Sequence, residues 1–244
     1  MAFGFGTGHA NFTVTGTVGL TRTGVAPEPP LPFNQTNSTS NIMAERFMKI
    51  ALTPSVLAAQ KHYFGNSQRI ADAPERDALT DDETQFIQSR ASFYMATVTE
   101  SGWPYMQHRG GQPGFLRVIS PTQLAFADYK GNRQLLSTGN LAVNDRVCLF
   151  LMDYPQCMRL KILGHARIED ARQHPELVAQ LAEPTVQRIV ERLFFIEVVS
   201  FDWNCPKYIT PRYTAAEVEE AVAPLRQRIA ELEAQIKTRT NKTN

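Results

Sequence analysis

The sequence predicts a mainly β fold, a small antiparallel barrel of short strands with helices at both ends of the chain. Between residues 91 and 212, short apolar runs are separated by turn residues, as in strands joined by hairpins. Residues 43–90 and 213–244 instead carry apolar residues at helical spacing. A chain of 244 residues with 43% hydrophobic residues fits one such domain with appendages.

The first 42 residues are predicted to be a disordered extension. They are rich in Gly, Thr, Asn and Pro, so they bury little apolar area. They also lack the basic start and apolar run of a signal peptide. The pattern becomes helical at Met43, so a native start at Met43 is an alternative. No run of about 18 apolar residues occurs, and we expect no membrane span.

Residues 43–90 are predicted to be helical. Apolar residues recur at helical spacing from Ala44 to about Phe64, with an interruption near Pro54. Thr80 followed by Glu83 forms a capping box, which predicts a short helix to about residue 89.

The strand pattern begins at Ser92. Turn residues at 100–102 and around Pro121 predict two hairpins. A helix is expected from Gly131 to about Leu141, after the fourth strand. The predicted strands are Ser92–Thr99, Trp103–His108, Phe115–Ile119, Gln123–Ala127, Arg146–Met152, Met158–Glu169 and Leu193–Trp203.

From Thr214 onward the chain is predicted to be a helix with a coiled-coil seam. Its apolar residues alternate in steps of four and three over nearly three heptads, despite Pro224. They are Val218, Val222, Leu225, Ile229, Leu232 and Ile236. This stripe could pack against the barrel of the same chain or against a neighbouring molecule.

Composition excludes several classes of function. The net charge of +1 argues against an electrostatic nucleic-acid binder. Cys148, Cys157 and Cys205 are odd in number and lack Cys-x-x-Cys spacing, which disfavours a disulfide framework or a zinc site and favours the cytoplasm. The histidines are scattered, so no metal is expected. No paired-carboxylate or nucleophile motif is present, and no catalytic residue is predicted.

Three clusters of cations and amides remain within the barrel region. Arg109 precedes Gly110 and Gly111, so its guanidinium group lies beside backbone that carries no side chains. A flat anion could bind directly against this backbone. Arg159 and Lys161 alternate within an apolar run and would share one face of a strand.

The other cluster lies at the predicted change from strand to helix. It contains Lys130, Asn132, Arg133 and Gln134. Because a helix start carries free backbone donors and a positive dipole end, this position suits a phosphate.

In this order, the three clusters resemble those of the pyridoxamine 5'-phosphate oxidase-like family of FMN-binding split barrels. The resemblance runs from about Ala91 to Arg212 and is strongest for a less characterised branch with an Arg-Gly-Gly-x-Pro-Gly-Phe signature, present at Arg109–Phe115. It implies an antiparallel, Greek-key-like split β-barrel, a homodimer with flavin at the interface, and FMN-dependent electron transfer.

The resemblance also implies roles for individual residues. The flavin phosphate would be held by Arg109, Lys130, Arg133 and either Arg159 or Lys161. The ring or ribityl chain would lie near Gln107, His108, Gly110 and Gly111, supported by Asn132 and Gln134. Trp203 and Arg212 would close over the flavin from the other subunit. Alternatively, Arg109 lies at the pyrimidine edge of the ring, where it would stabilise the reduced flavin.

The sequence departs from the true pyridoxamine phosphate oxidases. Their first cluster is an Arg followed by aliphatic residues and a Lys, whereas this chain has Gln107–Gly111 there. Gln134 replaces a second basic residue, and the C-terminal Arg-Leu-His-like run is absent. Oxidation of pyridoxamine phosphate is therefore not expected, and the substrate stays unknown. The alternatives are a flavin-binding, storage or sensor protein without turnover, and a barrel for a deazaflavin or haem.

Overall fold

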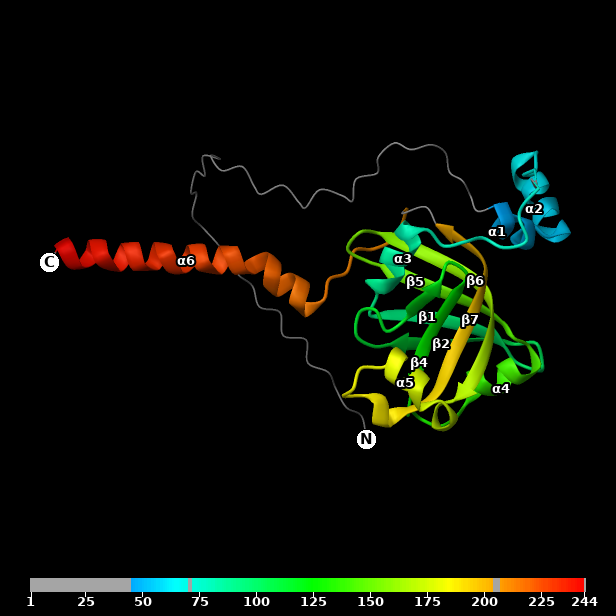
Figure 1. The fold of residues 1–244 in the computed structure, drawn as a ribbon. Coiled ribbons are helices and arrows are strands. Elements are labelled where there is room, and N and C mark those ends of the chain that lie inside the picture. Colours follow the sequence, from blue (N-terminus) through cyan, green and yellow to red (C-terminus); the bar gives the residue numbers. More distant parts are fainter. Residues whose placement is uncertain (1–44, 70–71, 204–206, 244) are drawn as a thin grey trace, which may run out of the picture. The chain divides into compact units, whose positions relative to one another are not determined.

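The computed structural model of the protein describes residues 45–69, 72–203 and 207–243 (Figure 1). The predictions for residues 1–42, Met43 and Cys205 lie outside these ranges. The helices are α1 Glu45–Ala51, α2 Pro54–Phe64, α3 Asp81–Gln88, α4 Leu136–Val143, α5 Pro175–Leu181 and α6 Ala215–Thr243. The strands are β1 Ser92–Val98, β2 Pro104–Gly110, β3 Arg117–Ser120, β4 Gln123–Tyr129, β5 Arg146–Asp153, β6 Met158–Asp170 and β7 Val190–Trp203.

The strands form one antiparallel sheet in the order β2-β1-β5-β6-β7-β4-β3. The two crossovers place β1 beside β5 and β7 beside β4, so the chain is mainly β with flanking helices, as predicted. All seven predicted strands are present. At the first hairpin, Gly102 has φ +87° and donates its N–H to the carbonyl of Thr99 at 2.9 Å. Glycine adopts this left-handed conformation without steric cost.

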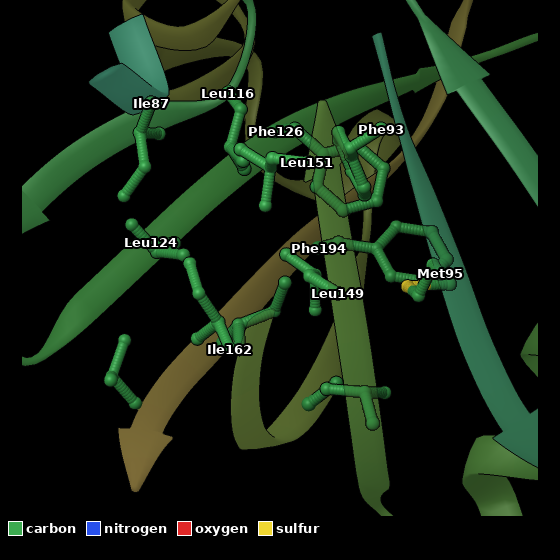
Figure 2. Packing of buried hydrophobic residues seen from close by; sticks show 14 of the residues in the cluster. Ile87, Phe93, Met95, Leu116, Leu124, Phe126, Leu149, Leu151, Ile162 and Phe194 are labelled. Carbon is green, nitrogen blue, oxygen red and sulfur yellow. The ribbon is translucent and has the colours of Figure 1, made fainter. Parts of the chain in front are cut away.

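The side chains at alternate strand positions point to the inner face of the curved sheet and form the core. Figure 2 shows Phe93 and Met95 of β1 facing Phe126 of β4 and Phe194 of β7. The rings of Phe126 and Phe194 stack with centroids 4.7 Å apart. Because each such side chain contributes about 1.5–3 kcal/mol when fully buried, this cluster is the main source of stability.

A smaller apolar cluster covers the outer face of β4 and β7. There, α5 packs Val178 and Leu181 against Ala125 and Ala127 of β4. These two alanines lie on the outer face while their neighbours fill the core, so β4 is buried on both sides. The sequence analysis did not predict α5.

A close approach of β6 and β7 depends on Gly164. A Cβ atom at this residue would lie 2.6 Å from the backbone carbonyl oxygen of Glu197, at a bulge between the two strands. No side chain fits there without a backbone shift, which explains the glycine in the middle of a strand.

The N-terminal helices confirm the local predictions. The helix pattern breaks after Ala51 and resumes at Pro54, whose fixed φ suits the first turn of α2. The capping box of α3 forms, with the Thr80 N–H donating to Glu83 Oε2 at 2.9 Å. Figure 2 shows Ile87 of α3 entering the core.

The predicted start of α4 is wrong: the helix begins at Leu136 and not at Gly131. Arg133 and Leu135 have φ values of +61° and +54°, which a right-handed helix cannot contain. The Asn132 Oδ1 atom accepts the backbone N–H of Gln134 at 3.1 Å, so an Asx turn replaces the first helical turn.

The last described element, α6, is a 29-residue helix that contains Pro224. Within the described ranges, no helix has both the length and the apolar content needed to cross a membrane.

Candidate functional site

An ion-pair cluster joins two strands that are not neighbours in the sheet. Arg109 of β2 donates a short hydrogen bond through Nη1 to Asp128 Oδ1 of β4. Arg192 of β7 approaches the other carboxylate oxygen, with Nε at 2.9 Å and Nη2 at 2.8 Å from Oδ2. Asp128 therefore lies between two guanidinium groups, and side chains connect β2 with β4 although the two strands do not pair.

This cluster is largely withdrawn from solvent. The side chains of Arg109 and Asp128 are 12% and 8% exposed, and the Arg109 guanidinium lies 5.2 Å from the Phe194 ring centroid. Burial lowers the pKa of Arg109, while Asp128 opposes the shift. Because an arginine starts from so high a pKa, it stays protonated. The Arg109 Nε atom is buried and has no hydrogen-bond partner among the described residues.

A cleft of about 170 Å³ opens above the ion-pair cluster. Its walls come from β2, from the end of β4, from the segment between β4 and α4, and from Arg192. The lining residues are Tyr105, Gln107, Arg109, Asp128, Tyr129, Gly131, Asn132, Arg133, Gln134, Leu135, Leu136, Ser137, Thr138 and Arg192. Three arginines face one aspartate, so the cleft carries an excess of two positive charges and suits an anion.

The segment from Lys130 to Leu135 is held in an unusual shape beside the cleft. Two non-glycine residues, Arg133 and Leu135, adopt left-handed conformations within three positions. Each costs of the order of 1–3 kcal/mol unless the surroundings impose it. The side-chain amides of Asn132 and Gln134 hydrogen-bond to each other at 3.3 Å, which helps to fix the segment.

The start of α4 lines the same cleft. Leu135 occupies the cap position and offers no side-chain hydrogen bond. The amides of residues 136–138 have no partner within the helix, and all three residues line the cleft. Ser137 Oγ donates to Gln107 Oε1 at 3.0 Å, which ties this helix end to β2. The positive end of a helix dipole beside arginines is an arrangement that suits a phosphate or carboxylate.

The structure brings five of the predicted site residues together in this cleft. They are Gln107, Arg109, Asn132, Arg133 and Gln134. Two of the three cation clusters, separated by about twenty positions in the sequence, therefore converge on one cavity. Lys130 is exposed and adjacent to the cleft without lining it, with its backbone N–H bonded to the carbonyl of Ile189 at 2.7 Å.

The motif from Gln107 to Gly111 is divided between the two faces of β2. Gln107 and Arg109 face the cleft, whereas His108 alternates to the other face and packs edge-on against the Tyr94 ring at 5.5 Å. Gly110 ends the strand beside the His108 ring, and Gly111 is covered by Phe115.

The remaining predicted residues lie elsewhere on this chain. Lys161 pairs with Asp202 at 2.9 Å, and Trp203 donates to Glu83 at 2.5 Å. The Arg212 guanidinium lies 5.0 Å from a tyrosine ring centroid. Arg159 does not line the cleft, and its Nε is buried without a hydrogen-bond partner among the described residues.

Sequence reasoning missed Asp128 and Arg192, which form the ion-pair cluster with Arg109. Asp128 is isolated in the sequence, and Arg192 belongs to no motif. Tyr105 was also missed, although the period of two along β2 places it on the same face as Gln107 and Arg109. Ser137 gives a weaker signal, as a polar residue near an expected helix start.

The sheet and its helices define the FMN-binding split-barrel fold. The family model described as pyridoxamine 5'-phosphate oxidase matches residues 79–200, which is half of the chain. The protein therefore belongs to this family. No curated protein sequence matches the chain.

The solved structures to which this chain is similar are distant in sequence. HupZ from Group A Streptococcus is 13% identical, with 50% of this chain and 92% of that chain covered and a TM-score of 0.38. A putative pyridoxamine 5'-phosphate oxidase from Lactobacillus delbrueckii is 17% identical, with 51% and 93% covered and a TM-score of 0.40. An FMN-binding protein from Syntrophomonas wolfei is 9% identical, with 51% and 87% covered and a TM-score of 0.36.

Proposed function

We propose that the protein is an FMN-dependent oxidoreductase whose cleft holds the phosphate end of the flavin. The observation that carries this proposal is the uncapped start of α4, which faces the same cavity as Arg109, Arg133 and Arg192. Backbone amides and guanidinium groups are the donors that a phosphate monoester needs. Family membership supports the same cofactor.

Each donor has a distinct part in this proposal. The exposed Arg133 side chain and the amides of residues 136–138 would contact the phosphate directly. Arg109 is held by Asp128, so it would act as a fixed charge at the base of the cleft. Gln107, already bonded to Ser137, would orient the helix start. Bound flavin would supply the electron transfer, and the protein its position and electrostatics.

The size of the cleft supports a homodimer. Sites for small molecules measure about 300–1,000 Å³, and the cleft of one chain measures about 170 Å³. This cleft by itself therefore offers room for only part of FMN. Two apolar residues that line the cleft are exposed, Leu135 and Leu136 at the start of α4. We propose that a second copy covers them and completes the site.

His108, Arg159, Lys161, Trp203 and Arg212 stay predictions for the part of the site that a second copy would complete. Their positions away from the cleft of their own chain are compatible with that role.

Identifying the native ligand tests the cofactor. Purified protein should be yellow, and mass spectrometry of the released ligand should give the mass of FMN. A deazaflavin or haem would identify one of the alternatives. A colourless protein that takes up no added FMN would refute the proposal.

Substitution of Arg133 tests the position of the phosphate. Removing one charge-assisted contact, worth about 1.5–3 kcal/mol, should weaken FMN binding by roughly 10-fold to 150-fold in Arg133→Ala. Riboflavin, which has no phosphate, should bind the native and variant proteins equally. The matched control is Arg69→Ala, because Arg69 is exposed and does not line the cleft. Equal loss of FMN affinity in both variants would show that the phosphate lies elsewhere.

A flavin-binding protein without turnover is the second candidate, and one feature of the cleft favours it. Its only carboxylate among the described residues is paired with two arginines, and arginine does not release its proton near neutral pH. The cleft therefore lacks a free carboxylate that could act as an acid or base. Reduction of bound flavin by NADH or NADPH, followed by reoxidation with several acceptors, separates the candidates. No reduction by either donor would favour binding alone.

A further inference from the structure

The C-terminal helix α6 carries an apolar stripe that nothing in the described chain covers. Five of its six stripe residues are between 41% and 63% exposed, and Val222 is half-buried. The exposed members are Val218, Leu225, Ile229, Leu232 and Ile236. In proteins, most of the stability of an amphipathic helix comes from packing of its apolar face. A continuous exposed stripe of this length therefore indicates a partner.

The residue types along the stripe specify what kind of partner fits. The steps of four and three place β-branched residues at three successive a positions of the heptad, namely Val222, Ile229 and Ile236. Leucine occupies the d positions 225 and 232, and Val218 occupies the d position before them. In parallel coiled coils, β-branched residues at a with leucine at d favour two strands over three or four. We infer that α6 pairs with α6 of a second copy of this chain, as a parallel, in-register, two-stranded coiled coil.

The charges beside the stripe fit the same arrangement. Arg228 occupies a g position and Glu233 the e position of the next heptad. In a parallel dimer these positions of the two helices face each other, so each Arg228 lies opposite Glu233 of the other copy. In the single chain, Arg228 instead bonds to Glu231 at 3.0 Å on the exposed surface. The interhelical contact is thus available without breaking any buried interaction.

Other occupants fit α6 less well. Between Ala215 and Thr243 the helix carries five acidic and five basic residues, so it has no basic excess for an anionic membrane surface. Pro224 lies at a c position, away from the stripe, so the kink that it introduces leaves the seam beyond Leu225 continuous.

This inference is independent of the proposed flavin site. The cleft lies between β2, β4 and α4 and uses no residue of α6. If the coiled coil is refuted, FMN binding by the barrel can still be measured separately. If the purified protein is colourless, the coiled coil is neither supported nor refuted.

Cysteine cross-linking of the full chain tests the pairing. Leu232→Cys places a thiol at a d position, next to its counterpart in a parallel in-register dimer. Ala234→Cys, at an f position on the opposite face, is the matched control, and both variants keep the native cysteines. After mild oxidation, disulfide between two copies of residue 232 should exceed disulfide between two copies of residue 234 several-fold, as identified by peptide mass spectrometry.

A mixture of Leu225→Cys and Ile236→Cys chains determines the direction of the helices. These positions are about 16 Å apart along one helix, so a parallel pair gives only disulfides between identical positions. A predominance of disulfides between residues 225 and 236 would show antiparallel pairing and overturn the inference. Equal cross-linking of the 232 and 234 variants would also overturn it, and would show that α6 has a different partner or none.

Discussion

The ion-pair cluster makes the sharpest prediction for stability. In Asp128→Ala, the guanidinium groups of Arg109 and Arg192 lose their shared counter-ion while their side chains stay 12% and 18% exposed. Breaking a buried pair in this way costs about 3–5 kcal/mol, because an uncompensated charge is left behind. The hydrogen bonds give a similar figure, since each arginine loses a charge-assisted contact of about 1.5–3 kcal/mol.

Urea unfolding followed by circular dichroism measures this loss as a free energy, and thermal unfolding measures it as a shift of the melting temperature. For a chain of this size, 1 kcal/mol corresponds to about 2–4 °C, so the melting temperature should fall by roughly 6–20 °C. The control is Glu183→Ala: Glu183 lies 3.7 Å from Arg117, and the two side chains are 63% and 42% exposed. A surface pair of this kind contributes about 0–1 kcal/mol.

Two results would refute the reasoning. One is a loss of stability in Asp128→Ala that does not exceed the loss in Glu183→Ala. The other concerns a variant with methionine at positions 109 and 192 and leucine at 128. Because apolar residues of similar volume need no counter-ion, this variant should be more stable than Asp128→Ala. If it is less stable, the cluster contributes through something other than its charges.

Three further predictions concern the rest of the barrel. Gly164→Ala should destabilise the protein by about 1–3 kcal/mol in urea unfolding, because its Cβ would lie 2.6 Å from the Glu197 carbonyl oxygen; unchanged stability would contradict this close approach. Hydrogen bonds from Arg172 lower the pKa of Asp170 to about 2, so its contribution to stability is present above the unfolded pKa near 3.8 and is lost as pH falls through about 2. Arg172→Ala should move the Asp170 midpoint upward in a carboxylate NMR titration, and an unmoved midpoint would count against the bond. Burial raises the pKa of Cys148, so its alkylation rate should rise with pH later than that of glutathione; an earlier rise would show an activated thiol.

The strands could be predicted because their signal is local. One face of each strand is buried in the core, so apolar residues alternate with polar ones along β1 and β6, and turn residues mark the ends. The capping box of α3 is equally local, since Thr80 and Glu83 are three residues apart. Both patterns predict the structure because they depend only on residues that are close together in the sequence.

The candidate site could be predicted only in part, because barrel closure assembles it. Arg109 and Arg133 could be found since each belongs to a recognisable cluster. Asp128 and Arg192 come close to Arg109 only when the sheet folds and brings β2 near β4 and β7. No spacing in the sequence predicts these contacts. The start of α4 was misplaced for a different reason: left-handed residues such as Leu135 have no reliable sequence signal when they are not glycine.

The charge of the cleft carries a consequence for selectivity. Its excess of two positive charges matches a phosphate monoester, whose charge near neutral pH is about −1.5 to −2. A monoanion of the same shape would leave part of this positive charge unneutralised. Under the proposed function, the cleft would therefore discriminate between ligands first by their charge and only then by their ring structure.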